Sequence, residues 1–257
     1  MDKIKLSIHN LNKEFEGKRI LNNVSFHVYE GEFLSILGPS GCGKTTILRI
    51  LTGILKADCG IIEKDGKDIT NVYPSERGMG IVFQNYALFE NMTVLQNVEY
   101  ALTIKKENKS KEAKRKIREQ VLEMIRHMEL EEHMNKKPVL LSGGQQQRVA
   151  IARTLVMKPD IILFDEPMSA LDVETRVSLR KVLKGIQQDF GTTMIYVTHD
   201  QEEAFSMSDR IMVMKEADIV QIDTPENLIK HPENDYVKEF VVENIQAKID
   251  SLKRYMR

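Results

Sequence analysis

Residues 38–45 have the types and the spacing needed to hold a phosphate group. They read Gly-Pro-Ser-Gly-Cys-Gly-Lys-Thr and match the pattern G-x-x-x-x-G-K-[S/T]. The glycines let the backbone turn tightly so that N–H groups point at one anion, and a helix starting after the loop adds the positive end of its dipole. Lys44 can reach the β- and γ-phosphates, and the Thr45 hydroxyl is placed to ligate Mg²⁺. The loop predicts nucleotide binding through Gly38, Ser40, Gly41, Cys42, Gly43, Lys44, Thr45 and Thr46.

Two acidic residues, Asp165 and Glu166, follow the apolar run at 161–164. A buried strand that ends in acids places their carboxylates at the sheet edge where a phosphate loop opens. Asp165 suits Mg²⁺ binding through water. Because side chains alternate along a strand, Glu166 is expected to point the other way, where it can orient or deprotonate an attacking water. Taken alone, the pair has a simpler interpretation as two acids capping a buried strand.

A second candidate anion site is the run Leu-Ser-Gly-Gly-Gln at residues 141–145. Ser142 is expected to cap a helix, and the two glycines that follow leave backbone amides uncovered. Here the chain resembles ATP-binding cassette proteins, and the other motifs of that family follow in order over residues 4–235. The resemblance implies a dimer in which each chain offers its Ser142, Gly143, Gly144 and Gln145 to the phosphate loop of the other.

The same resemblance assigns roles to further residues. It implies that Phe15 stacks on adenine, although the family more often has Tyr there and a core aromatic is the alternative. It implies that Gln84 contacts Mg²⁺ and the reacting water, and that His199 hydrogen-bonds the γ-phosphate. Residues 169–172 resemble the loop that meets its own copy across the dimer, with Asp172 in a structural role. The implied catalytic residues are Lys44, Gln84, Glu166 and His199, the implied Mg²⁺ ligands are Thr45, Gln84 and Asp165, and the implied small molecules are ATP and Mg²⁺.

These residues must be positioned by a sheet whose strands alternate with helices. Two early strands separated by Glu16-Gly17 predict a small antiparallel sheet. Later strands separated by helices predict a mainly parallel α/β sheet, as in a P-loop NTPase core. The helix after the phosphate loop is expected over Lys44–Leu55. The predicted strands are Ile4–Leu11, Val24–Val28, Glu32–Leu37, Met79–Phe83, Ile161–Phe164 and Thr193–Val197.

The middle of the chain predicts an inserted helical subdomain at about residues 85–150. Apolar residues recur there at helical spacing over Glu112–Leu130, opposite charged residues. The cassette domain is expected to cover residues 1–240. Residues 241–257 are expected to form a short helical tail that continues a face of apolar residues beginning at Val237, which packs in the core or in a dimer.

Composition excludes several classes of protein. The 257 residues carry 37 Lys plus Arg, 38 Asp plus Glu and 42% hydrophobic residues, which is typical of a globular chain without a basic stripe for nucleic acid. No run of 18 apolar residues and no secretory signal is present. Cys42 and Cys59 make no disulfide framework, which fits a reducing cytoplasm. Any membrane role is expected to come through a partner, at the cytoplasmic face of the membrane as a peripheral subunit.

The resemblance implies an ATPase that powers a separate transmembrane permease, with a solute-binding protein as an indirect partner. Residues 83–89 and 92–94 look like the importer branch that serves sugars, polyamines, ferric iron and phosphonates, although Glu90-Asn91 departs from the Pro-His common there. Only a short segment follows Tyr236, which fits polyamine, ferric iron or phosphonate systems better than sugar systems. The alternative is a soluble cassette ATPase acting on nucleic acid, but the long heptad helices or zinc-binding cysteines of those relatives are absent from this sequence. A simple P-loop kinase has no use for residues 141–145.

Overall fold

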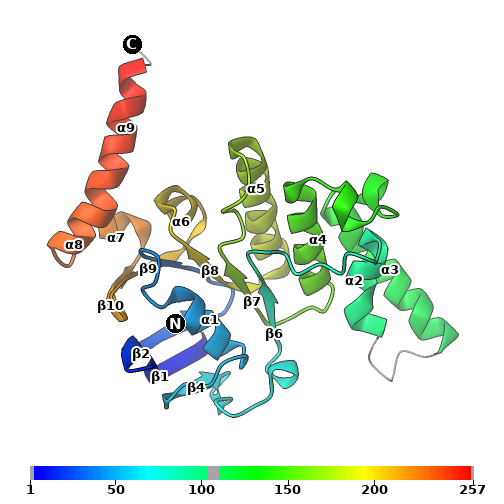
Figure 1. Ribbon diagram of the computed structural model, residues 1–257, viewed down its shortest axis with the longest axis horizontal. Helices are drawn as coiled ribbons and strands as arrows, with labels where there is room; N and C mark the ends of the chain where they lie inside the picture. The colour runs from blue at the N-terminus through cyan, green and yellow to red at the C-terminus, as the bar shows by residue number, and fades with distance from the viewer. Residues whose placement is uncertain (1–2, 104–109, 256–257) are drawn as a thin grey trace. The chain divides into compact units, whose positions relative to one another are not determined.

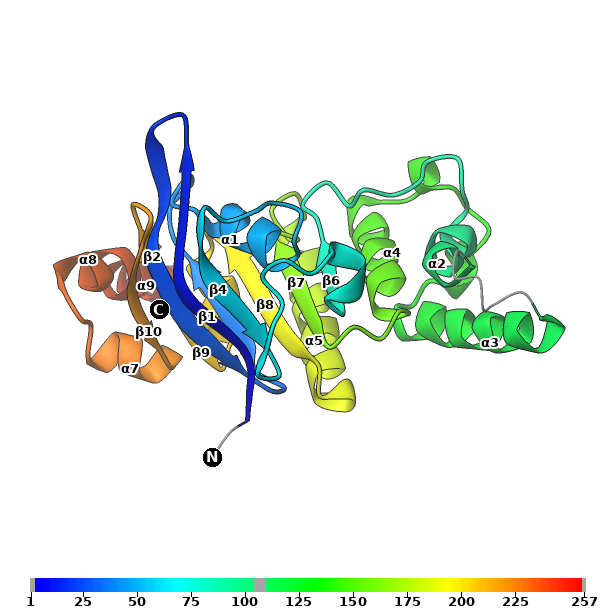
Figure 2. The same ribbon diagram turned by 90° about the horizontal axis from the view of Figure 1, so that it is seen from below.

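The computed structural model describes residues 3–103 and 110–255, which fall into two compact units. The first unit comprises Met1–Arg77 and Gly191–Arg257, and the second comprises Gly78–Phe190. Each unit combines strands and helices, which Figures 1 and 2 show from two sides. The chain has an antiparallel sheet and a mainly parallel set of strands, so the predicted α/β class is confirmed.

The antiparallel sheet of the first unit has the strand order β2-β1-β4-β5. Its long hairpin turns at Glu16 and Gly17, which have φ of 50° and 77°, as a two-residue turn matched to strand twist requires. β1 and β2 run further than predicted because their ladder continues through several register shifts, which break the alternating pattern that sequence reasoning follows. The strands are β1 (Ile4–Phe15), β2 (Lys18–Tyr29), β4 (Cys59–Lys64) and β5 (Lys67–Asp68).

The mainly parallel strands of the first unit lie in the order β10-β9-β3-β8. β3 is parallel to both of its neighbours, and β10 returns antiparallel to β9. Every residue of β3 and of β8 is buried, as expected for a sheet covered on both faces. The sequence predicted β3 and β8 and missed the other two. The strands are β3 (Phe33–Leu37), β8 (Thr193–Thr198), β9 (Arg210–Lys215) and β10 (Asp218–Asp223).

The helix after the phosphate loop, α1 (Lys44–Leu51), is shorter than the predicted Lys44–Leu55. Its end is set by Gly53, at φ 78°, and by Arg77, whose guanidinium donates to the carbonyl oxygens of Ile50 and Leu51 at 2.9 and 2.7 Å. A cation at the carboxyl end of a helix also complements the dipole. The other helices of this unit are η1 (Pro74–Glu76), α6 (Gln201–Met207), α7 (Pro225–Lys230), α8 (Asp235–Val237), the π-helical turn η5 (Lys238–Glu243) and α9 (Asn244–Tyr255).

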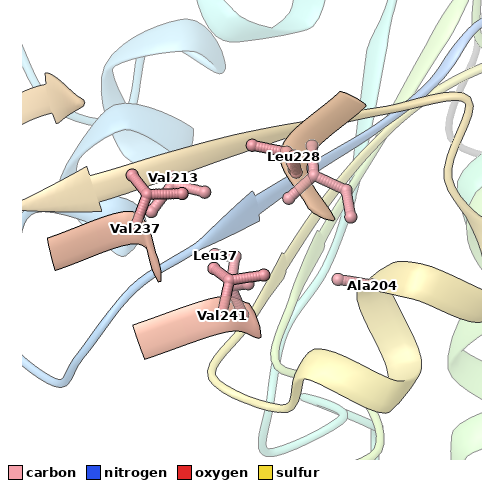
Figure 3. Packing of buried hydrophobic residues seen from close by; sticks show 7 residues of the cluster. Leu37, Ala204, Val213, Leu228, Val237 and Val241 are labelled. Atoms are coloured by element: carbon pink, nitrogen blue, oxygen red, sulfur yellow. The ribbon is translucent and has the colours of Figure 1, made fainter. Parts of the chain in front are cut away.

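The C-terminal helices pack on the first unit through a buried apolar cluster (Figure 3). Strands β3 and β9, helix α6 and the C-terminal helices all contribute to it. Phe240 and Ile245 lie against its edge, so core packing is confirmed for this part of the predicted C-terminal face, whereas Ile249 is 40% exposed. The expected boundary between residues 240 and 241 falls inside η5. The cluster consists of Leu37, Ala204, Ile211, Val213, Leu228, Val237 and Val241.

The second unit contains the parallel strand pair β6 and β7 and a group of helices. Val82 pairs with Phe164 near the carboxyl ends of the two strands. Figure 2 shows α2, α3 and α4 lying together, and the predicted helical subdomain at 85–150 lies within this unit. The elements are β6 (Met79–Val82), β7 (Ile161–Asp165), α2 (Val94–Thr103), α3 (Lys111–His127), η3 (Glu131–His133), η4 (Pro138–Leu140), α4 (Gly143–Leu155) and α5 (Val173–Phe190).

Candidate functional site

The phosphate loop joins β3 to α1 in the first unit, as the sequence predicted. Lys44 begins α1 and is only 4% exposed. Its Nζ donates to the carbonyl oxygens of Gly38 and Pro39 at 2.8 and 2.9 Å. The loop therefore encloses the Lys44 ammonium group, and two of its carbonyl oxygens accept hydrogen bonds from that group. Thr45 and Thr46 lie half-buried in the first turn of α1.

Three positions of this loop require glycine for different reasons, either a positive φ or a close approach of neighbouring atoms. Gly41 and Gly43 have φ of 81° and 107°, a region that L side chains rarely adopt. A Cβ at residue 43 would lie 2.6 Å from the Ile20 carbonyl oxygen, whereas residue 41 has open space around it. Gly38 has ordinary φ, but a Cβ there would lie 2.7 Å from the Met214 carbonyl oxygen. The loop is thus held close to the strands beneath it.

Cys42 fills space under the loop. Its side chain is buried, and its Sγ would lie 2.8 Å from a Cβ placed on Gly38. Burial raises the pKa of the thiol, and the nearby Lys44 ammonium opposes that shift. The thiol is therefore a protonated packing group near neutral pH.

His199 and Phe15 lie in the first unit with the phosphate loop. Leu37 pairs with Thr198 across the parallel strands β3 and β8, so Gly38 and His199 both follow directly at the same carboxyl edge. Phe15 ends β1, is 45% exposed and has the Lys13 Nζ 5.1 Å from its ring centroid. Its exposure excludes the core-aromatic interpretation and leaves a ring face available for stacking.

A buried acid that sequence reasoning missed supports the turn at His199. Glu203, only 3% exposed, accepts hydrogen bonds from the Tyr196 hydroxyl and from Thr198 Oγ1, both at 2.8 Å. Thr198 Oγ1 also accepts from the Asp200 N–H at 2.9 Å. These bonds fix the backbone on both sides of His199.

In the second unit, Gln84 and Glu166 follow β6 and β7 at the same carboxyl edge. Gln84 Nε2 donates to Ser169 Oγ at 3.1 Å, and that hydroxyl donates to the Glu166 carbonyl oxygen at 3.0 Å. Asp165 ends β7 and is 8% exposed. One hydrogen-bonded chain therefore connects the glutamine to the loop that carries the predicted general base.

The predicted reason for the direction of Glu166 is wrong. β7 ends at Asp165, so Glu166 is not a strand residue and strand alternation does not orient its side chain. Instead, Glu166 has φ 46°, a left-handed conformation that costs a non-glycine residue about 1–3 kcal/mol. Backbone strain of this kind clusters at functional sites.

Residues 142–145 form the predicted helix cap. The Gln145 N–H donates to Ser142 Oγ at 3.3 Å, and the Ser142 N–H donates to Gln145 Oε1 at 2.9 Å, which completes a capping box at the start of α4. A Cβ at Gly144 would lie 2.3 Å from Thr175 Cγ2, so glycine allows α4 to approach α5. A residue missed in the sequence, His133, contacts the Gln145 amide through its Nε2 at 2.8 Å.

Arg153, near the end of α4, holds the chain that follows Gln84. Its guanidinium donates to the carbonyl oxygens of Tyr86 and Ala87 at 3.0 and 2.7 Å. Both of these residues have positive φ, at 60° and 48°. Burial lowers the pKa of Arg153. The helix that starts at the capping box therefore also fixes the shape of the loop after Gln84.

Asp172 caps α5. Its carboxylate accepts from the Thr175 N–H at 2.9 Å and from the Thr175 hydroxyl at 2.7 Å, and these bonds lower the pKa of the carboxyl. This is the structural role expected from the sequence.

Within residues 3–103 and 110–255, no three or more His, Cys, Asp or Glu side chains group together in a way that could hold a metal ion. Over the same part of the chain, no helix has both the length and the apolar character needed to cross a bilayer.

The comparison with known proteins covers the part of the chain that holds the phosphate loop and the capped segment. Residues 21–169 match the family model described as ABC transporter. The chain belongs to the ABC transporter family. It is 50% identical over 236 residues, 92% of this chain, to the spermidine/putrescine import ATP-binding protein PotA of Mycoplasma capricolum, and 45% identical over 95% of this chain to the PotA of Thermotoga maritima. The chain spans about two thirds of the length of these curated relatives, 66% and 65%.

Solved structures show the same fold. CbiO1 from Clostridium perfringens, described as part of the ABC transporter complex cbiONQ, aligns with a TM-score of 0.82 at 30% identity, covering 97% of this chain and all of that one. The ATP-binding cassette MJ0796, described as a dimer in a post-hydrolysis state bound to ADP and Pi, aligns with a TM-score of 0.75 at 36% identity, covering 86% of this chain and 98% of that one.

Proposed function

We propose that this chain is the ATP-hydrolysing subunit of an importer and that it works as a dimer closed by ATP. The observation that carries the proposal is the capping box at Ser142 in a chain that also holds a phosphate loop around Lys44. Gly143 and Gly144 follow this cap without side chains, so the backbone amides at the start of α4 are open to a phosphate group held by another copy. Membership in the ABC transporter family supports this interpretation.

In the proposed site, the backbone N–H groups of Gly38 and of residues 40–46 cradle the ATP phosphates, and Lys44 leaves its loop carbonyls to reach the β- and γ-phosphates. In the structure, Lys44 donates to two neutral carbonyl oxygens. Negatively charged phosphate oxygens are stronger acceptors, so they can replace these carbonyls. Phe15 stacks on adenine, which its exposure allows. His199 hydrogen-bonds the γ-phosphate, and the Glu203 network holds it in place.

The donor set proposed for Mg²⁺ fits that ion. Thr45, Gln84 and Asp165 offer a hydroxyl, an amide and a carboxylate oxygen, the hard ligands that Mg²⁺ prefers together with phosphate oxygens and water. Gln84 uses its Nε2 on Ser169, which directs its Oε1 elsewhere. When bound, Mg²⁺ would neutralise charge that develops on the phosphate oxygens.

Glu166 is the proposed general base. Its carboxylate orients or deprotonates the attacking water, Gln84 contacts the same water, and Lys44 and His199 stabilise charge on the transferring group. The left-handed backbone at Glu166 supports this role, because such strain persists only where the surrounding structure imposes it. The products are ADP and phosphate.

The proposed dimer places Ser142, Gly143, Gly144 and Gln145 of each copy against the ATP held by the other. ATP then binds the closed dimer better than the open one, and this difference in affinity is what allows ATP to shift the equilibrium and hydrolysis to reverse it. The dimer described for MJ0796 supports a dimeric state for this chain.

The proposed transport function is the import of polyamines. The relatives named for spermidine/putrescine import favour polyamines over ferric iron or phosphonates. A separate permease would carry the solute, with its solute-binding protein acting indirectly. The permease would dock on the helical subdomain near residues 84–99, so that the chain lies peripherally at the cytoplasmic face of the membrane. No feature of the described residues favours nucleic acid as a partner, and the near-neutral charge balance disfavours it.

The substitution Glu166→Gln tests the proposal. The variant should bind ATP, lose turnover and remain a dimer in sedimentation velocity while ATP is present, whereas the same variant carrying Lys44→Ala should stay monomeric. A Glu166→Gln chain that hydrolyses ATP at the wild-type rate would remove the general base from the proposal, and a monomer with ATP bound would remove the dimer.

A further inference from the structure

The orientation of the Gln145 amide is fixed by a backbone donor. The Ser142 N–H can only donate, so the atom that it meets at 2.9 Å must be the Gln145 oxygen, Oε1. The Gln145 NH₂ group therefore faces the other way, where the His133 Nε2 lies 2.8 Å from it. The amide cannot flip without breaking the capping box.

This geometry determines which nitrogen of the His133 ring accepts a hydrogen bond. An amide NH₂ donates and does not accept, so the His133 Nε2 must accept and carries no proton. A neutral ring then holds its proton on Nδ1. That nitrogen is buried and has no hydrogen-bond partner in the described part of the chain. In this position the His133 ring orients the Gln145 amide.

The backbone around His133 holds the ring at a fixed place. The His133 N–H donates to the Leu130 carbonyl oxygen at 3.0 Å, and the Lys136 N–H donates to the His133 carbonyl oxygen at 2.9 Å. The following loop is tied to the start of α2, because the Leu95 N–H donates to the Met134 carbonyl oxygen at 3.0 Å. His133 is therefore a rigid acceptor.

We propose that His133 is a positioning residue that, as the neutral Nδ1–H tautomer, holds the Gln145 amide in the capping box and so keeps the amides of residues 143–144 aligned. The inference rests on the proposed function for its consequence, the closure of the dimer on ATP. Its structural part, the tautomer and the hydrogen bond, stands independently of that function.

Two substitutions separate the acceptor from the packing. His133→Phe keeps a ring of similar size but removes the acceptor, and His133→Gln supplies an Oε1 acceptor at about the reach of Nε2. In the Glu166→Gln background, His133→Phe should weaken ATP-driven dimerisation about tenfold, because the part-buried Gln145 donor loses its partner. His133→Gln should recover most of that loss. His127→Phe, the same change at an exposed histidine of α3, is the matched control and should have no effect.

The second readout is the ¹⁵N spectrum of the His133 imidazole in the full chain, assigned by its loss in His133→Gln. The expected result is a neutral ring protonated on Nδ1. An Nε2–H ring would overturn the proposal, and so would a His133→Phe variant that dimerises like its parent while Gln145→Ala is impaired. If Gln145→Ala itself has no effect on dimerisation, the proposed role of the capped segment fails, and the imidazole spectrum still decides the positioning of Gln145.

Discussion

Replacing Gly43 with alanine tests the geometry of the phosphate loop. Gly43 has φ 107° and sits directly before α1. An alanine there adopts a disfavoured backbone conformation, at a cost of about 1–2 kcal/mol, and its Cβ lies 2.6 Å from the Ile20 carbonyl oxygen and 2.8 Å from Leu21 Cδ2. Relieving these contacts adds about 1–3 kcal/mol, as overpacking of a filled site does. The lower entropy of the unfolded alanine chain returns about 0.4–1 kcal/mol.

The net expectation for Gly43→Ala is a loss of about 3 kcal/mol in the free energy of unfolding, measured by urea titration. Gly41→Ala is the matched control, because residue 41 has φ 81° in the same loop but nothing within 4 Å of its Cβ. Gly41→Ala should cost about 1 kcal/mol or less. The difference of about 2 kcal/mol isolates the contact with β2. Two variants of equal stability would show that the loop does not lie against Ile20.

Three further predictions concern other parts of the first unit. Arg77→Ala should lower the free energy of unfolding by about 3 kcal/mol in thermal melts, because four hydrogen bonds to backbone carbonyls are lost, and Arg77→Lys should recover only part of it. Exposed Cys59 should react with a maleimide before buried Cys42, whose raised pKa keeps it a thiol at neutral pH so that its reaction accelerates as the pH rises. Mass spectrometry of digested protein measures the order of labelling, and labelling of Cys42 before Cys59 would contradict the prediction. Unchanged ATP binding after complete modification of Cys42 would contradict its place beneath the loop. Phe15→Ala should weaken ATP binding by about tenfold in calorimetry while Phe15→Tyr has little effect, and equal affinities would argue against stacking.

The sequence predicted the elements whose signals are local. β3, β7 and β8 are short apolar runs, and the phosphate loop and the cap at Ser142 are determined by residue types at fixed spacing. The end of α1 was placed too late because it depends on Arg77, which is distant in the sequence. The apolar run at 211–214 is a detectable signal for β9, but the helix that separates it from β8, α6, has only seven residues and shows no clear helical repeat in the sequence.

Features that depend on contacts between distant segments of the chain leave no signal in the local sequence. The positive φ of Glu166 arises from the turn after β7, and nothing in the residue type announces it. His133 and Glu203 act through side chains that meet only in the folded chain, and a histidine or an acid in a polar stretch normally reads as a solvated surface residue. Sequence motifs therefore predict the groups expected to contact ATP. They do not predict the residues that hold those groups in place, because those residues are brought together only by folding.

Mixing two inactive variants shows whether each ATP pocket is built from two copies of the chain. In the Glu166→Gln background, a chain with Lys44→Ala and a chain with Ser142→Arg should each fail to retain ATP alone. If each pocket takes Lys44 from one copy and Ser142 from the other, random pairing makes about half of the dimers mixed, each with one intact pocket, so an equal mixture should retain about a quarter of the ATP held by the parent dimer. A mixture that retains no more ATP than the separate chains would place the whole pocket within one polypeptide and rule out a shared pocket.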